Sequence, residues 1–283
     1  MNRYFPGSTF VLSLFASTSL YAQVGTENTA AHPTITESTV AEGDFNRYLL
    51  EFDGPHTPTP RLADGTVDLG GNGVWNLPWV SNLANAQQKP GPAPWKPWVQ
   101  AMWEYHNANT SKYDPEGFCL PPGGPRSMAT PYPAEIIQNR DRIVFIFEGD
   151  MHVWREIHMD GRPQPADLNP TYFGNSTGYW DGDTLVVDTI GYNEKSWLDY
   201  SGHQHTEQLH TVEYISRPYK EKLHYKVIID DPGAFDAPWT AEWDILWSEG
   251  QELQDYICQE NNKYLLDLRD DLDQPYFEKS SGL

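Results

Sequence analysis

The chain has few cysteines and few basic residues for its length. Its 283 residues include two cysteines, and 19 lysines and arginines stand against 40 aspartates and glutamates, giving a formal net charge of −21. This excess of negative charge repels nucleic acid and acidic membrane surfaces, so we expect no nucleic-acid partner. After the N-terminal stretch no run of about 18 apolar residues occurs, which argues against a membrane span.

Two catalytic signatures are also missing. The sequence contains neither a glycine-rich phosphate loop nor the G-x-S-x-G motif of a nucleophile elbow. Cys119 and Cys258 are not part of a C-x-x-C motif, which argues against a catalytic thiol. In an exported chain two such cysteines predict one disulfide, and a pair of unpaired buried thiols is the alternative.

The N-terminal half predicts export and then irregular structure. Residues 1–22 combine one arginine with the apolar run FVLSLFASTSLYA, the layout of a signal peptide cleaved after Ala22, so we expect a periplasmic or extracellular protein. Residues 23–52 hold few large apolar groups and predict a flexible leader. Residues 53–133 are rich in Pro, Gly and Trp, and predict an irregular overlay with one helix after Pro97.

From residue 134 to 265 the pattern changes to alternating strands and short turns. Four hairpins are predicted: 142–147 with 151–158, 176–180 with 183–190, 207–216 with 222–230, and 240–247 with 251–258. A meander of about eight strands tends to close because closure removes unpaired edges. We therefore predict an all-β fold, an antiparallel up-and-down barrel or strongly curved meander. The overlay belongs to the same domain, and residues 266–283 form a tail.

The stretch SGHQHTEQLH at 201–210 holds three histidines and a glutamate. If it is extended, His203, His205 and Glu207 point to one side and could bind a divalent metal, zinc or iron, with His210 added by a bulge. In a helix His203, Glu207 and His210 would share a face, but the residues that follow favour a strand. Glu207 is also a candidate general base. A hydrogen-bonded loop without a metal is the alternative.

A second polar cluster lies on one predicted hairpin. His152, Glu156 and His158 share a strand face, and the two histidines are candidate acid–base or metal-binding groups. Alternating polar residues of this kind are also typical of a solvated face. Which strand face looks inward is left open.

Aromatic residues are abundant, with 11 tryptophans and 16 tyrosines. In an exported protein they indicate a pocket for a hydrophobic or ring-shaped molecule, and a well-filled core is the alternative. We assign ligand binding to three of them, Trp154, Trp180 and Tyr214.

The motif GNSTGYWDGDTLVVDT at 174–189 resembles the pattern GxSxGxWxGDTLVVDT of a broad family of secreted bacterial proteins. Other motifs of that family have counterparts here: CLPPGGPR (119–126), TPYP (130–133), MDGRPQP (159–165), GHQHTE (202–207) and CQEN (258–261). The resemblance covers roughly residues 70–262 and departs at Thr206, where the family has serine. It implies one domain containing both cysteines, and no particular activity. GVW at 73–75 is similar to the opening of lipocalin barrels.

Two functions are consistent with these features. The first is binding of a small hydrophobic or ring-shaped organic molecule in an aromatic pocket. The second is a metal- or His/Glu-dependent enzyme, a lyase, isomerase or hydrolase, that uses His203, His205 and Glu207.

Overall fold

The structure is a computed structural model that describes residues 47–48, 54–86, 93–109, 112–149 and 153–260. All of them belong to the unit Ala31–Leu283. The predicted signal peptide and C-terminal tail lie outside the described residues. So does the predicted leader, apart from the two residues of strand β1 (Arg47–Tyr48).

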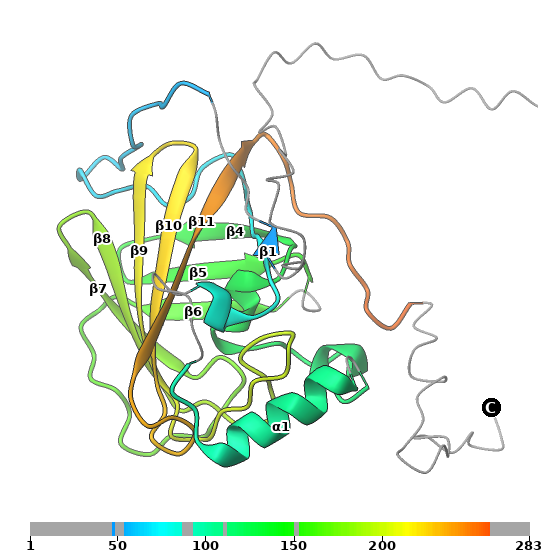
Figure 1. The fold of residues 1–283 in the computed structure, drawn as a ribbon. Coiled ribbons are helices and arrows are strands. Elements are labelled where there is room, and N and C mark those ends of the chain that lie inside the picture. Colours follow the sequence, from blue (N-terminus) through cyan, green and yellow to red (C-terminus); the bar gives the residue numbers. More distant parts are fainter. Residues whose placement is uncertain (1–46, 49–53, 87–92, 110–111, 150–152, 261–283) are drawn as a thin grey trace, which may run out of the picture. The chain divides into compact units, whose positions relative to one another are not determined.

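Within the described residues nine strands close into a barrel, which confirms the predicted all-β barrel with one helix (Figure 1). Around the barrel they follow the order β10 (Lys222–Asp230), β11 (Trp239–Glu249), β2 (Gly73–Asn76), β4 (Pro133–Gln138), β5 (Arg142–Phe147), β6 (Trp154–His158), β7 (Asn175–Asp181), β8 (Thr184–Ile190) and β9 (His210–Tyr219). β9 pairs with β10 and completes the ring. Separately, β1 pairs with β3 (Trp79–Val80).

Three of the four predicted hairpins are present, as the antiparallel pairs β5–β6, β7–β8 and β9–β10. The fourth is wrong, because residues 251–258 form no strand. β11 instead pairs with β2, from Leu246 opposite Asn76 to Glu249 opposite Gly73. The segment expected to be an overlay therefore supplies a barrel strand, which contains the GVW tripeptide.

One neighbouring pair is parallel, which the up-and-down prediction did not include. β6 and β7 pair at Ile157 with Ser176 and at His158 with Thr177. A parallel pair requires a crossover connection, here residues 159–174. The motif DGRPQP within this connection contains two prolines, which lack the N–H group that a sheet ladder needs. The chain therefore leaves the sheet here instead of turning tightly.

Strand β6 shows which face looks inward. Trp154 is 65% exposed, and Glu156 and His158 are half-buried, whereas Arg155 and Ile157 are buried. The face that carries the predicted polar cluster is thus the outer one. The inward apolar residues of the barrel form one core cluster together with residues from the connecting segments.

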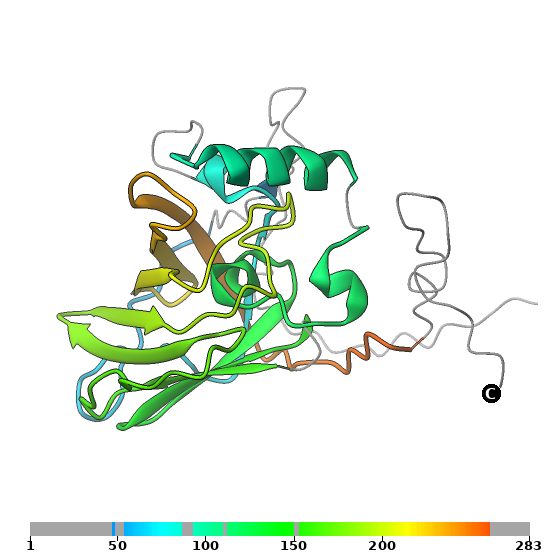
Figure 2. The same ribbon diagram turned by 90° about the horizontal axis from the view of Figure 1, so that it is seen from below.

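Helix α1 (Pro97–Ala108) lies against one end of the barrel (Figure 2). Its first residue is a proline, whose fixed φ suits a helix start. Val99 and His106, seven residues apart on one face, are buried. Trp98 Nε1 donates to the carbonyl oxygen of Gly233, in the loop between β10 and β11. No helix among the described residues is long and apolar enough to cross a membrane.

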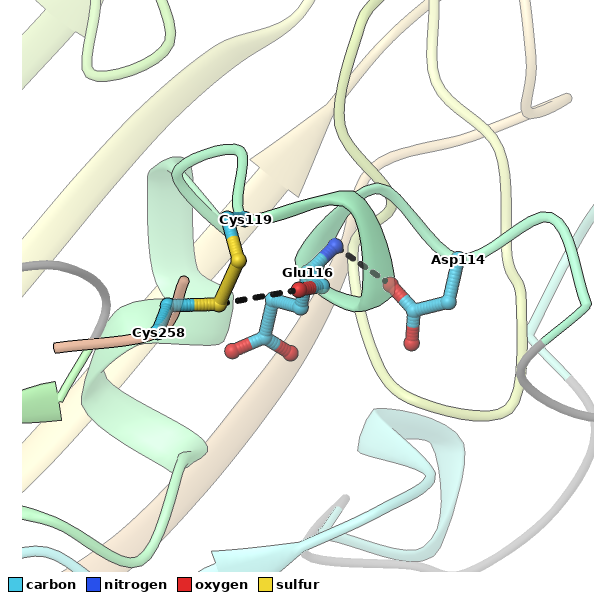
Figure 3. The surroundings of a disulfide bond; sticks show 4 residues. All are labelled: Asp114, Glu116, Cys119 and Cys258. Carbon is cyan, nitrogen blue, oxygen red and sulfur yellow. Dashed lines mark hydrogen bonds between the residues drawn. A yellow bond between two sulfur atoms is a disulfide. The ribbon is translucent and has the colours of Figure 1, made fainter. Parts of the chain in front are cut away.

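Cys119 and Cys258 form the predicted disulfide (Figure 3). Cys119 follows a short 3₁₀ turn, which Asp114 caps by accepting from the Glu116 backbone N–H at 3.1 Å. Cys258 Sγ lies 4.0 Å from the Glu116 carbonyl oxygen. The buried Arg126 guanidinium forms ion pairs with both Asp114 and Glu116. The disulfide and this charge cluster hold the same turn.

Candidate functional site

The predicted histidine cluster lies in the loop between β8 and β9, at the barrel end where α1 lies (Figure 2). The expectation of a strand here is wrong, since residues 202–206 form no strand and β9 begins only at His210. Aspartate side chains accept hydrogen bonds from backbone N–H groups that, in a strand, would donate to a neighbouring strand. Asp199 Oδ1 accepts from His203 N at 3.3 Å, and Asp231 Oδ2 accepts from Thr206 N at 2.6 Å.

Asp199 and His203 form a buried pair. Asp199 Oδ2 lies 2.5 Å from His203 Nδ1, and both side chains are 0% exposed. The carboxylate also accepts from the Leu83 N–H and from the Ser201 hydroxyl, each at 2.9 Å. Burial alone would raise the pKa of Asp199, but the His203 imidazole and the N–H donors outweigh it, and the pKa is lowered. Asp199 is therefore a carboxylate, which accepts the Nδ1 proton of His203.

The other nitrogen of this imidazole, Nε2, is buried and has no hydrogen-bond partner within the described residues. In the tautomer that carries its proton on Nδ1, a neutral imidazole has a lone pair on Nε2. A buried polar atom without a partner costs about 1–3 kcal/mol. A catalytic role is one explanation for a buried polar atom without a partner in a folded protein.

Two indoles stack on the same imidazole. The ring centroids of Trp95 and His203 are 4.3 Å apart with an interplanar angle of 21°, and those of Trp103 and His203 are 5.4 Å apart at 10°. Trp103 belongs to α1, and its Nε1 donates to Ser201 Oγ at 3.2 Å. The surroundings of His203 are therefore flat and aromatic, and α1 contributes directly to them.

A third histidine ties α1 to this loop. His106 Nδ1 lies 2.9 Å from the Gly202 carbonyl oxygen, and its ring stacks on Trp197 at 4.3 Å. Gly202 has φ +96°, and a Cβ atom at this position would lie 2.3 Å from His106 Cβ. Only glycine permits this close approach of the loop to the helix.

His205 has different partners from His203. Its Nδ1 lies 3.2 Å from the Thr206 carbonyl oxygen, which can only accept, so Nδ1 carries the proton. Its Nε2 lies 3.3 Å from Ser196 Oγ. The ring meets Tyr192 edge-on, with centroids 6.3 Å apart. Burial lowers the pKa of His205.

The predicted metal ligands do not form one group. His210 Nε2 pairs with Asp188 Oδ2 at 2.9 Å, Glu207 is exposed, and His203 and His205 have the separate partners given above. Among the described residues no set of three or more His, Cys, Asp or Glu side chains is placed to hold a metal ion. The geometry gives no support to the zinc or iron site predicted from the sequence.

The second predicted cluster lies apart from this loop. His152 falls outside the described residues. His158 Nδ1 is 4.0 Å from Glu156 Oε1 on the outer face of β6, so this pair does not look into the barrel. The catalytic roles assigned to His152 and His158 stay predictions.

The three aromatic residues predicted to bind a ligand occupy three different strands. Trp154 is mostly exposed on β6, and Trp180 on β7 is partly buried against the core. Tyr214 is half-buried on β9, with Lys226 Nζ 5.5 Å from the ring centroid. The tryptophans that stack on His203 are Trp95 and Trp103, which the sequence did not single out.

A buried ion pair inside the barrel was also missed. Arg155 and Glu213 are 4% and 1% exposed, and Arg155 Nη1 donates to Glu213 Oε1 at 2.8 Å. Arg155 also donates to Ser176 Oγ and Thr189 Oγ1, and the Tyr225 hydroxyl donates to Glu213 Oε1 at 2.6 Å. Despite burial, Glu213 raises the pKa of Arg155 above its usual range. With these partners satisfied, the network is a structural element of the interior.

No protein-family model, no curated protein and no solved structure matches this chain. The side chains around His203 and His205 therefore carry the functional inference.

Proposed function

We propose that this chain is an exported β-barrel protein that binds a small ring-shaped organic molecule beside His203 and catalyses proton transfer on it. One observation carries the proposal: the buried His203 Nε2 has no partner within the described residues, while Asp199 holds Nδ1. An imidazole oriented by a carboxylate, with its second nitrogen free, is the arrangement of a general base. His203 would take the proton, and Asp199 would stabilise the imidazolium that forms.

The aromatic surroundings support a flat substrate. Trp95 and Trp103 lie nearly parallel to the His203 ring, so a ring-shaped molecule could stack on an indole while its acidic C–H approaches Nε2. Because Nε2 is buried, binding requires α1 or the loop to shift. A net charge of −21 favours neutral or cationic substrates.

Export and family membership are parts of the same proposal. The disulfide Cys119–Cys258 supports an oxidising compartment. Membership in the family of secreted bacterial proteins is proposed from the shared sequence motifs, two of which lie near His203 and His205. GHQHTE (202–207) contains His203 and His205, and CLPPGGPR (119–126) contains Gly123, which lies against Ser196.

Hydrogen exchange at carbon tests the proton transfer without knowledge of the complete reaction. The full chain is incubated in D₂O with a panel of cyclic and aryl ketones, and ¹H NMR follows deuterium uptake next to the carbonyl group. We expect at least one ketone to exchange faster with the protein than without it. His203→Gln should lower that rate about 100-fold or more, and Asp199→Asn should lower it through the wrong tautomer.

His224→Gln is the matched control. His224 Nδ1 lies 2.9 Å from Asp244 Oδ1, so it is also a histidine paired with an aspartate, but its side chain is 39% exposed on the outside of the barrel. This variant should exchange at the wild-type rate. If no ketone exchanges faster with wild type than with His203→Gln, the acid–base proposal is refuted.

Binding without chemistry is the second candidate, and the stacking of Trp95 and Trp103 at His203 favours it, since indole faces bind rings regardless of a base. Saturation-transfer NMR on the same panel separates the two. Ketones that bind, lose affinity in Trp103→Ala and show no exchange would establish the binding function alone.

A further inference from the structure

We propose that Ser196 is a nucleophile, activated by His205, that attacks the carbonyl carbon of a small ester. Ser196 Oγ lies 3.3 Å from His205 Nε2, and the two residues are 2% and 3% exposed. A hydroxyl beside the acceptor nitrogen of an imidazole is the arrangement of nucleophilic catalysis. The inference goes beyond the role of His203, whose imidazole has other partners.

The orientation of His205 suits a base for this hydroxyl. The Thr206 carbonyl oxygen accepts the hydrogen bond from His205 Nδ1, the role that a carboxylate has in a catalytic triad. This leaves His205 Nε2 to accept from Ser196. Asp231 and Glu194 lie close enough for their negative charges to act on the ring and to stabilise an imidazolium. Burial keeps the resting imidazole neutral, which is the form that accepts a proton.

Main chain, not a side chain, lies against the nucleophile. Gly123 has φ +66°, and a Cβ atom there would lie 3.1 Å from Ser196 Oγ and 2.3 Å from the Tyr172 carbonyl oxygen. A side chain at this position is therefore excluded. The Gly123 backbone packs directly against the buried Ser196 hydroxyl, and an ester reaches this hydroxyl only if the surrounding segments shift.

The reaction needs only an ester and water. Ser196 Oγ forms a bond to the ester carbonyl carbon while its proton passes to His205 Nε2. The bond from that carbon to the alkoxy oxygen then breaks, and the alcohol leaves with the proton from His205. A water molecule then attacks the acyl-serine and loses a proton to His205. The bond between the acyl carbon and Ser196 Oγ breaks, His205 returns the proton to Oγ, and a carboxylic acid leaves. The charge of the chain favours neutral or cationic esters.

An alkyl fluorophosphonate is the probe, because it phosphonylates activated serines with loss of fluoride. The full chain is treated with the probe, and peptide mass spectrometry locates the adduct. We expect one adduct, on Ser196, and none in Ser196→Ala. His205→Gln should slow the labelling about 100-fold or more.

Ser127→Ala is the matched control. Ser127 is equally buried, and its hydroxyl lies 3.5 Å from the Gly123 carbonyl oxygen, so it flanks the same glycine without a histidine partner in the described residues. This variant should be labelled at the wild-type rate. Near-UV circular dichroism verifies that each variant folds.

An unlabelled Ser196 in the folded protein, an adduct on another residue instead, or an unchanged labelling rate in folded His205→Gln overturns the proposal. His203→Gln separates it from the proton-transfer function. That variant should lose carbon-bound hydrogen exchange and keep the Ser196 adduct, so either proposal can fail without the other.

Discussion

Replacing Glu213 by glutamine should destabilise the barrel more than any single change of an outer-face charge. The substitution keeps the size of the side chain but leaves Arg155 as a buried cation without a counter-charge. Arg155 is 4% exposed and donates to two hydroxyls besides Glu213, so it cannot turn to solvent without breaking this network.

The expected magnitude follows from burial. Removing one member of a buried ion pair costs about 3–5 kcal/mol, because the remaining charge has already lost its water. For a domain of this size roughly 2–4 °C of melting temperature corresponds to 1 kcal/mol, so Glu213→Gln should lower the melting temperature by roughly 6–20 °C. The double variant Arg155→Met, Glu213→Leu should be more stable than Glu213→Gln, since no unpaired charge remains.

Urea unfolding followed by tryptophan fluorescence measures these differences. Glu156→Gln is the control, because Glu156 pairs with Arg142 on the outer face, where the side chains are 35% and 58% exposed. It should cost less than about 1 kcal/mol. A loss below about 1 kcal/mol for Glu213→Gln, or a double variant less stable than the single one, would show that this pair is not buried inside a closed barrel.

Three further perturbations have defined outcomes. Cys119→Ser with Cys258→Ser opens a loop of 139 residues and should cost up to about 5 kcal/mol in the chain-entropy model, measured by urea unfolding. Burial raises the pKa of Tyr192 from 10.0 to about 12, so this tyrosine ionises in the unfolded chain at a lower pH than in the folded protein. Up to about 3 kcal/mol of the free energy of unfolding should therefore be lost as pH rises from 10 to 12. Tyr192→Phe should remove this loss from the pH profile of urea unfolding. Gly202→Ala should lower the melting temperature more than Gly250→Ala. Both glycines have positive φ, but only at Gly202 would the added Cβ clash with α1. Equal losses at the two glycines would contradict the packing of α1 on the loop.

The strands could be predicted from the sequence wherever one face is buried and the other is exposed to solvent. β10, and β9 as far as Arg217, alternate between buried and half-buried residues, and period-two patterning locates such strands well. β2 gives no such signal, because its first three residues are all buried and it has only four. Its neighbours β11 and β4 lie far away in the chain, so the pairing follows from barrel closure rather than from local sequence.

The sequence singled out His203 and His205 by their density, but as metal ligands. Their ring partners come from the same loop and from Trp95 and Trp103, far away in the chain. Asp199 lies four residues before His203, and this spacing is a weak signal. Trp95 and Trp103 reach the site through the position of α1, which no local pattern gives. The metal hypothesis assumed a strand, whereas aspartate side chains accept the backbone N–H groups of this loop and the histidine rings have separate partners.

The protonation of the His203 ring tests the account most directly. A long-range ¹H–¹⁵N correlation spectrum of protein labelled with ¹⁵N-histidine identifies which nitrogen carries the proton, and His203→Gln assigns the signal. The account predicts a neutral ring with the proton on Nδ1, shared with Asp199, and a bare Nε2 whose resonance shifts when a ketone from the panel binds. A proton on Nε2 with Nδ1 bare, or an Nε2 resonance that no binding ketone shifts, would contradict it.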